Sequence, residues 1–466
     1  MEEHTNNEEK LSIDTELNTK LLDQNHHDHK GGLRTMPFII VNEAFERIAS
    51  YGLTPNMIFY LMEVYHMEAV TGTSILSIWS ALSNTLSIFG AYISDSYLGR
   101  FHVIAIGSLS TLFGMTFLWL TSMVPQLTPS SCNELGSSCS EPSLTQLAFL
   151  FSTFGLLSIG SGCIRPCSIA FGADQLKHHP TLNNQRLIDS YFNWFLNKAC
   201  VLNDLNVDSS CVNPWSVSTV EKVESLKSII RIIPIWSSGI ILFTTITQNF
   251  PTLQANTMNR HITSSFEIPA ASFTLFMVLT VTLWIAIYDR ILVPVLANLT
   301  HEPRGLNTKT RMGIGLLISI LAMVVSAIVE SIRRHVARSV SNTHAMSAMW
   351  LVPQYSLCGL AEAFNAVGQL EFYYSELPKS MSSLPMALFM VSNAISGLVS
   401  SLLINVVNSV TSEGGKVSWL SSDMNEGHID YYYWLLSFLN LLNFFYYLLC
   451  CRAHRSLSSS SFITRE

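Results

Sequence analysis

Nine long stretches of this 466-residue sequence contain no Asp, Glu, Lys or Arg. Each stretch is at least 18 residues long, and about 20 apolar residues carry a helix across the hydrocarbon core of a bilayer. Charged residues make up only 13% of the chain, against about 25% in an average soluble protein. The pattern predicts a multi-span membrane protein with helices at 69–94, 101–133, 142–164, 232–259, 268–288, 312–329, 339–361, 380–412 and 431–451.

A tenth span is predicted at 36–62, although three charged residues interrupt it. Apolar segments flank Glu43, Glu46 and Arg47 on both sides. A charged residue at mid-membrane costs about 2.5–3.5 kcal/mol on insertion scales, so three together indicate a water-facing function. We therefore expect an all-α, polytopic membrane protein with about ten transmembrane helices.

The Lys and Arg residues predict the orientation of the chain. Most of the 26 lie on the cytoplasmic side if the N-terminus is cytoplasmic. Arg333, Arg334 and Arg338 are a local exception on the outer side. The predicted segments are a disordered cytoplasmic tail (1–35), a four-span bundle (36–172), a central cytoplasmic loop (173–231), a six-span bundle (232–451) and a cytoplasmic tail (452–466).

The first 34 residues are polar and rich in Asn, Glu and His. They have no apolar core of the kind that a signal peptide carries, so we expect no cleavable signal. His26, His27 and His29 could bind a metal ion, but a solvated tail is the preferred interpretation.

Nine cysteines are scattered without the CxxC spacing of zinc sites, so no metal site is expected. Cys132 and Cys139 share one polar loop. If that loop is extracellular, the two residues can form a disulfide, because that environment is oxidising.

Motifs of enzymes and ATP-driven pumps do not occur in the sequence. There is no GxxxxGK[ST], no HExxH and no GxSxG between a strand and a helix. There is also no basic patch of the kind that binds nucleic acid. We expect a protein that is not an enzyme, that requires no cofactor, and whose partners are the lipid bilayer, protons and a small solute.

Glu43, Glu46 and Arg47 fall within about a third of the helix circumference at 100° per residue. One interpretation is a structural ion cluster that fixes the helix to a neighbour. The other is a proton site, in which movement of the guanidinium changes the affinity of a carboxyl group for a proton. Ionisable groups inside a membrane are functional by default, so we favour the proton site.

Two further charged residues lie alone in apolar sequence. Arg165 is near the cytoplasmic end of the fourth span, and Glu362 lies in the eighth. Each needs a partner or water. A pair across the bundle would satisfy both and could act as a gate, although a permanent structural bridge is the alternative.

A short turn between the second and third spans contains Asp95, Gly99 and Arg100. An Asp at such a place can cap the next helix and meet a partner helix when the bundle rocks. The turn is therefore a candidate conformational switch.

Short motifs follow one another along the chain in a characteristic order. They are E-A-F-E-R at 43–47, D-S-Y-L-G-R at 95–100, I-R-P-C at 164–167, F-N-W-F at 192–195, P-I-W-S at 234–237, A-E-A-F at 361–364 and G-H-I-D-Y-Y-Y-W at 427–434. This order resembles the proton-coupled oligopeptide transporter family, in its plant nitrate and peptide transporter branch.

The resemblance implies the major facilitator fold, with two six-helix halves and alternating access to a central cavity. It also implies that Glu43, Glu46 and Arg47 couple transport to protons. By the same resemblance Arg165, Glu362 and Tyr51 line the substrate cavity or its gate.

The chain departs from the family at one junction. Phe195 is followed directly by Leu196-Asn197-Lys198, a segment that lies far downstream in the family. Helices five and six are therefore expected to be absent, which leaves ten spans instead of twelve. A spliced or misassembled transcript is the simple explanation.

The sequence thus predicts a proton-coupled symporter of a small solute, such as nitrate, a short peptide, a hormone or another small organic acid. One alternative is a truncated, non-transporting form that regulates full-length transporters in a homo- or hetero-oligomer. Another is a solute sensor. The plasma membrane is the expected location, ahead of the vacuolar membrane.

Overall fold

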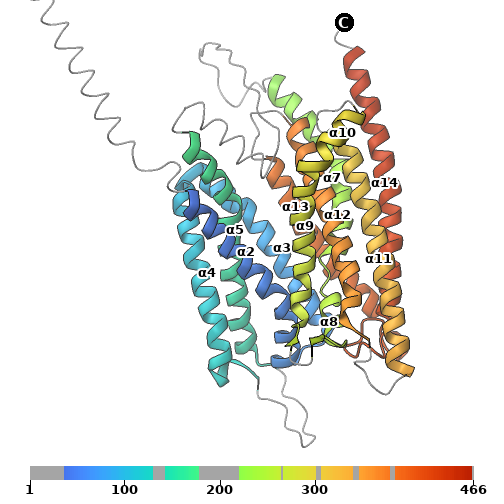
Figure 1. Ribbon diagram of the computed structural model, residues 1–466. Helices are drawn as coiled ribbons and strands as arrows, with labels where there is room; N and C mark the ends of the chain where they lie inside the picture. Colours follow the sequence, from blue (N-terminus) through green and yellow to red (C-terminus); the bar gives the residue numbers. More distant parts are fainter. Residues whose placement is uncertain are drawn as a thin grey trace, which may run out of the picture.

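The computed structural model describes residues 36–129, 142–177, 220–263, 266–300, 306–339, 346–377 and 384–463. These residues form a bundle of long helices, with the C-terminus at one end (Figure 1). The N-terminal tail, Cys132, Cys139 and the junction at Phe195 lie outside the described residues.

The helices follow the apolar stretches of the sequence. Their bounds are α2 Met36–Phe59, α3 Ala69–Ile93, α4 Arg100–Met123, α5 Leu144–Lys177, α7 Val220–Ile246, α8 Phe250–Asn256, α9 Thr274–Ile287, α10 Val293–Thr300, α11 Thr308–Ser339, α12 Val352–Glu376, α13 Leu384–Thr411 and α14 Ile429–Ile463. Turns of π-helix extend α2 (η2, Tyr60–Val64) and α3 (η3, Ser94–Leu98) and join α9 to α10 (η6, Tyr288–Leu292). Short 3-10 turns are η4 Pro125–Leu127, η5 Ala270–Phe273 and η7 Ala348–Leu351, and a hairpin pairs β1 His261–Thr263 with β2 Phe266–Glu267.

Eight helices of the described residues are long and apolar enough to cross a membrane. They are Ala69–Leu98, Arg100–Met123, Leu144–Ser168, Ser228–Asn256, Ala270–Leu296, Thr308–Ser339, Leu384–Thr411 and Ile429–His454. The membrane-protein class is therefore clear, while the expected count of ten spans stays a prediction.

The other two expected spans correspond to α2 and α12, of 24 and 25 residues. Charged residues interrupt the apolar sequence of both helices, with Glu43 and Glu46 on α2 and Glu362 and Glu371 on α12. The expected span at 339–361 is misplaced, because the helix there is α12, which begins at Val352. Arg311 of α11 bonds to Glu371 of α12 over 2.7 Å. The bundle therefore pairs the charge of Glu371, whereas a search for uncharged stretches leaves this part of α12 out.

The segment expected as a central loop is shorter in the structure. Helix α5 continues to Lys177 and α7 begins at Val220, so both enter the range 173–231. The remaining residues between them, 178–219, are not among those described.

The helices gather in two groups. Helices α2, α4 and α5 lie on one side of the bundle and α11 and α14 on the other, with α3 and α13 side by side between them (Figure 1). The apolar windows of α9 and α4 are only 17% and 22% buried, against 50% for α5, α7 and α11. Helices α4 and α9 are therefore the most peripheral spans.

The two groups are joined at the end of the bundle opposite the C-terminus. This end holds the start of α3, the end of α13 and the start of α14, and we call it the outer end because the charge distribution predicts it outside. Ser74 of α3 bonds to Ser401 of α13, and Asn405 Nδ2 donates to Ser74 Oγ over 2.8 Å. A buried apolar cluster that includes Leu61 of η2 and Tyr432 of α14 spans the same end.

A glycine lets α3 and α13 approach closely. A Cβ atom at Gly397 would lie 2.6 Å from the Ser77 carbonyl oxygen and 3.0 Å from the Ala81 Cβ. Small residues at such crossings allow helix backbones in a membrane to pack together.

We expect Gly397→Ala to destabilise the protein by about 1–3 kcal/mol, because the added methyl group must push the two helices apart. The check is the thermal unfolding midpoint of the purified chain in detergent. Gly155→Ala on α5 is the matched control, since nothing lies within 4 Å of a Cβ there. Equal midpoints for the two variants would contradict the proposed close approach.

Candidate functional site

Glu46, Ser50 and Arg165 form a ring of hydrogen bonds between α2 and α5. Glu46 and Ser50 are one turn apart on α2, so they share a face of the helix. Ser50 Oγ donates to Glu46 Oε1 over 2.9 Å. Arg165 donates from Nε to the same carboxylate oxygen and from Nη2 to Ser50 Oγ, each over 3.1 Å. We call this group the Glu46–Ser50–Arg165 triad.

The triad contains one negative and one positive charge, both largely withdrawn from solvent. The side chain of Glu46 is 6% exposed and that of Arg165 is 19% exposed. Buried charges are tolerated when they are paired and hydrogen-bonded, and losing one partner leaves the other charge uncompensated. Uptake of a proton by Glu46 would therefore leave Arg165 with a positive charge in need of another anion.

The triad borders a cavity of about 160 Å³ among α2, α3, α4 and α5. Its wall combines hydroxyl groups, apolar side chains and the triad. The hydroxyl groups belong to Ser50, Thr54, Ser80, Ser83, Thr111 and Ser161, and the apolar side chains are Ala49, Leu53, Trp79, Met115 and Leu157. Such a wall suits a small solute with one polar end.

Trp79 is the largest side chain of the cavity wall, and its ring is held in place. It stacks on Phe154 of α5 with the ring centroids 4.6 Å apart and the planes 15° from parallel. Its Nε1 donates to the Phe154 carbonyl oxygen over 3.1 Å. The indole is thus a fixed apolar surface against which a solute can pack.

The residues expected at the first span are distributed unequally around this site. Glu46 lines the cavity, while Glu43 is half-buried one turn earlier on α2 and is not among the lining residues. Tyr51, expected in the cavity wall, is 46% exposed and is not among the lining residues either. Arg47 lies on α2, but its side chain is outside the part of the chain that the structure describes.

Arg165 has a different partner from the one expected. Its ion pair is with Glu46 of α2, within the N-terminal group of helices, and not with Glu362. Glu362 lies half-buried on α12, in the C-terminal group. Glu46 lies on the neighbouring helix and can reach Arg165 without a contact across the bundle.

The short turn expected between the second and third spans is the π-helical turn η3 followed by Gly99. Gly99 has φ 75°, a conformation that favours glycine, and Arg100 is the first residue of α4. Asp95 lies within η3, and Gly99, not Asp95, is the N-cap of α4, without a side-chain cap. The side chain of Asp95 is outside the described residues, so the capping role expected for it stays a prediction.

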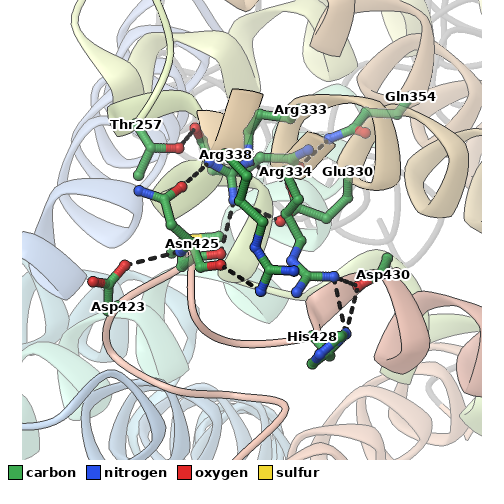
Figure 2. A network of polar contacts seen from close by, with 12 residues as sticks. Thr257, Glu330, Arg333, Arg334, Arg338, Gln354, Asp423, Asn425, His428 and Asp430 are labelled. Atoms are coloured by element: carbon green, nitrogen blue, oxygen red, sulfur yellow. Dashed lines mark hydrogen bonds and ion pairs between the residues drawn. The ribbon is translucent and has the colours of Figure 1, made fainter. Parts of the chain in front are cut away.

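A second group of charges at the outer end was not foreseen as a site (Figure 2). Arg333 donates to both carboxylate oxygens of Glu330, each over 2.8 Å, and both side chains are fully buried. Arg334 donates to Asp430 of α14 over 2.8 Å. The only signal in the sequence was the unusual number of Arg residues on the outer side.

Most of the chain matches the model of one protein family. The model described as POT family matches residues 101–201 and 196–420. The chain belongs to the POT family. Among its POT family relatives, Protein NRT1/PTR FAMILY 1.2 of Arabidopsis thaliana is 40% identical in an alignment that covers 90% of this chain and 89% of that protein.

Solved POT family structures share the fold. The crystal structure of an auto-inhibited POT family peptide transporter has a TM-score of 0.67 at 17% identity and covers 90% of this chain and 97% of that chain. A POT family transporter in complex with 5-aminolevulinic acid has a TM-score of 0.59 at 14% identity, with 90% and 96% covered. The chain is thus a multi-pass membrane transporter of the POT family, and the expected all-α fold of the major facilitator type is confirmed.

Proposed function

We propose that this POT family member is a proton-coupled symporter of a small solute, with Glu46 as the residue that takes up the proton. The observation that carries the proposal is the Glu46–Ser50–Arg165 triad at the edge of the cavity. An ion pair that borders a cavity can exchange one of its charges for a proton or a solute, whereas an ion pair in a packed core cannot.

Proton and solute are coupled through the charge of Arg165. Protonation of Glu46 neutralises the carboxylate and ends its attraction for the guanidinium. An anionic group of the solute then restores the charge balance, and its two oxygens can accept from the planar donor fork of Arg165. When the solute leaves, Arg165 attracts the carboxylate again, and Glu46 gives up its proton.

The lining favours a solute with one anionic end and a small body. Arg165 is the only cation among the residues that border the described cavity, and the apolar part of the lining includes Trp79 and Met115. A small carboxylic acid fits both the cationic and the apolar part of the lining, and nitrate fits the cationic part. The solved relative in complex with 5-aminolevulinic acid supports such a ligand class.

The electrochemical gradient is large enough to drive such uptake. The membrane potential supplies about 2.3 kcal/mol per charge per 100 mV, and one pH unit supplies about 1.4 kcal/mol. Together they support roughly 500-fold accumulation of a neutral solute with one proton. A monovalent anion carried with one proton is electroneutral, so it gains only the pH contribution, about tenfold per unit.

We also infer that helices five and six of the family are missing from this chain. Two observations support the inference. The family model matches in two segments that meet at residues 196–201, and the alignment with Protein NRT1/PTR FAMILY 1.2 has 541 positions although only 90% of this 466-residue chain takes part. That relative therefore contains many residues without a counterpart here.

The packing of the two groups of helices agrees with this inference. In the C-terminal group the first helix, α7, is covered by α13 and α14, as in the bonds from Trp236 to the Leu388 carbonyl and from Asn443 to the Ser238 carbonyl, each over 2.8 Å. In the N-terminal group α2 is the first described helix, and its Phe38 and Ile48 are 77% and 68% exposed. The absence of two helices that would cover α2 accounts for this exposure.

The test is uptake by the 466-residue chain in a heterologous cell, with arrival at the surface measured separately. Nitrate, a dipeptide and a small carboxylic acid would each be offered at acidic and neutral external pH. We expect uptake of at least one of them to increase at acidic pH. Protein at the surface that binds solute without uptake would overturn the proposal in favour of a sensor, and protein that neither binds nor transports would favour a regulatory form.

A further inference from the structure

The loop between α13 and α14 connects the two groups of helices at the outer end. Toward the N-terminal group, Ser422 Oγ accepts from the Ala69 amide at the start of α3 over 3.1 Å. Leu420 and Met424 are buried in the same apolar cluster as Leu61 of η2. This loop, residues 412–428, is therefore part of the outer closure.

The same loop is fixed to α11 by the charged cluster of Figure 2. Arg333 Nη1 donates to Asn425 Oδ1 over 2.8 Å, and its Nη2 donates to the Met424 carbonyl over 2.9 Å. Since Arg333 also holds Glu330 with two bonds, its orientation is set from within α11. The loop is thus attached at one side to α3 and at the other to α11.

His428 is the last residue of the loop before α14. Its Nδ1 lies 2.9 Å from Arg334 Nη1, and its ring stacks on Tyr431 at 4.6 Å with the planes 8° apart. The His428 amide donates to the Trp419 carbonyl over 2.9 Å. Because a guanidinium can only donate, Nδ1 must accept this bond, which requires a neutral imidazole with its proton on Nε2.

The charges that face His428 oppose its protonation on balance. Arg334 and Arg338 approach from α11, and Asp430 approaches from α14 with Oδ1 3.8 Å from Nδ1. Partial burial lowers the pKa of His428 from its ordinary 6.5, the two Arg residues lower it further, and Asp430 opposes them. Its side chain is 34% exposed, so protons of the outer solution can reach it.

We propose that His428 is a second proton-binding site, separate from Glu46, whose protonation from the outer side releases the loop that holds the two groups of helices together. A proton on Nδ1 would make this atom a donor that faces the donor Nη1 of Arg334, so their hydrogen bond must break. The protonated ring would then compete with Arg334 for Asp430. This proton opens the outer closure and is not carried with the solute.

The pH dependence has a definite sign. The pKa of His428 is lower in the closed form than in an open loop, where the ordinary value of 6.5 applies. The stabilisation of the closed form is therefore complete above pH 6.5 and is lost as the pH falls through the lowered pKa. Acid on the outer side weakens the closure, and neutral or alkaline solution strengthens it.

The experiment is hydrogen exchange, measured by mass spectrometry on the purified full chain at about pH 7.5 and about pH 5, the range in which histidine changes charge. Exchange of the loop amides would be divided by the intrinsic rate at each pH. We expect this ratio to rise about tenfold in acid, the factor that corresponds to about 1.4 kcal/mol. The amides of Gly427 and His428, both bonded within the loop, are the reporters.

His428→Gln separates the proposal from a general effect of acid. The amide oxygen of Gln can accept from Arg334 but takes up no proton, so the loop should stay protected at both pH values. His335→Gln is the control, because His335 is exposed at the same end of α11 and should leave the acid response intact. A wild-type loop that does not respond to acid, or a His428→Gln loop that still opens, would overturn the proposal.

Discussion

The Glu46→Gln variant is expected to lose the uptake that an external acid pH stimulates, by about tenfold or more for each unit of pH difference. Gln has nearly the shape of Glu, and its amide oxygen can still accept from Ser50 Oγ and from Arg165 Nε. The cavity should therefore keep its lining. The variant lacks a group that can take up and release a proton, so the proton gradient cannot drive uptake.

Counterflow separates a loss of coupling from a loss of folding. With equal pH on both sides and solute inside, an intact cavity can exchange labelled solute without net proton movement. We expect Glu46→Gln to retain this exchange, since Arg165 stays positive and available to an anionic solute. Glu63→Gln is the control, because Glu63 is exposed in the turn that extends the same helix. Acid-stimulated uptake by Glu46→Gln would disprove the coupling role.

The Arg333→Met variant is expected to show the largest loss of stability, about 3–5 kcal/mol, which is typical when one partner of a buried ion pair is removed. The Glu330 side chain is fully buried and accepts both of its hydrogen bonds from Arg333. Without the guanidinium the buried carboxylate loses the partner of both hydrogen bonds. The loop would also lose the bonds that Arg333 donates to Asn425 Oδ1 and to the Met424 carbonyl.

A second substitution tests this cause. In Glu330→Gln/Arg333→Met both charges are absent, and replacement of a whole buried pair is often neutral, so most of the lost stability should return. Arg338→Met should change stability by less than about 0.5 kcal/mol, since Arg338 is exposed and makes a single 3.3 Å bond to the Asn425 carbonyl. Thermal midpoints in detergent at one scan rate compare the three variants. A double variant no more stable than Arg333→Met would refute the explanation.

The sequence alone predicted the class of the protein, most of its helices and the charged face of α2. These features follow from local rules, because the absence of charge over a membrane's thickness and the angular spacing of Glu43 and Glu46 can both be read from neighbouring residues. The boundaries of α12 could not be found in this way. Its charged residues are accommodated by partners such as Arg311, which come from another helix.

The partners within the site were harder to predict than its members. Arg165 was recognised as a charge in need of a partner, but helical periodicity does not tell which helices pack together, and Glu362 was chosen instead of Glu46. The role of Ser50 gave no signal at all. Serine and threonine in membrane helices commonly bond to their own backbone, as Ser83 does to the Trp79 carbonyl over 3.0 Å.

Two polar groups of the outer closure have a second partner on their own helix, in addition to the one across the contact between α3 and α13. Ser77 Oγ donates to the Thr73 carbonyl of its own helix over 3.0 Å as well as lying 3.4 Å from Ser400. Asn405 reaches the Ser401 carbonyl over 2.8 Å in addition to Ser74. When α3 and α13 separate, Ser77 and Asn405 therefore keep a partner, and their donors are not left unsatisfied. The polar groups of Ser77 and Asn405 consequently add little to the free-energy cost of separating the two helices.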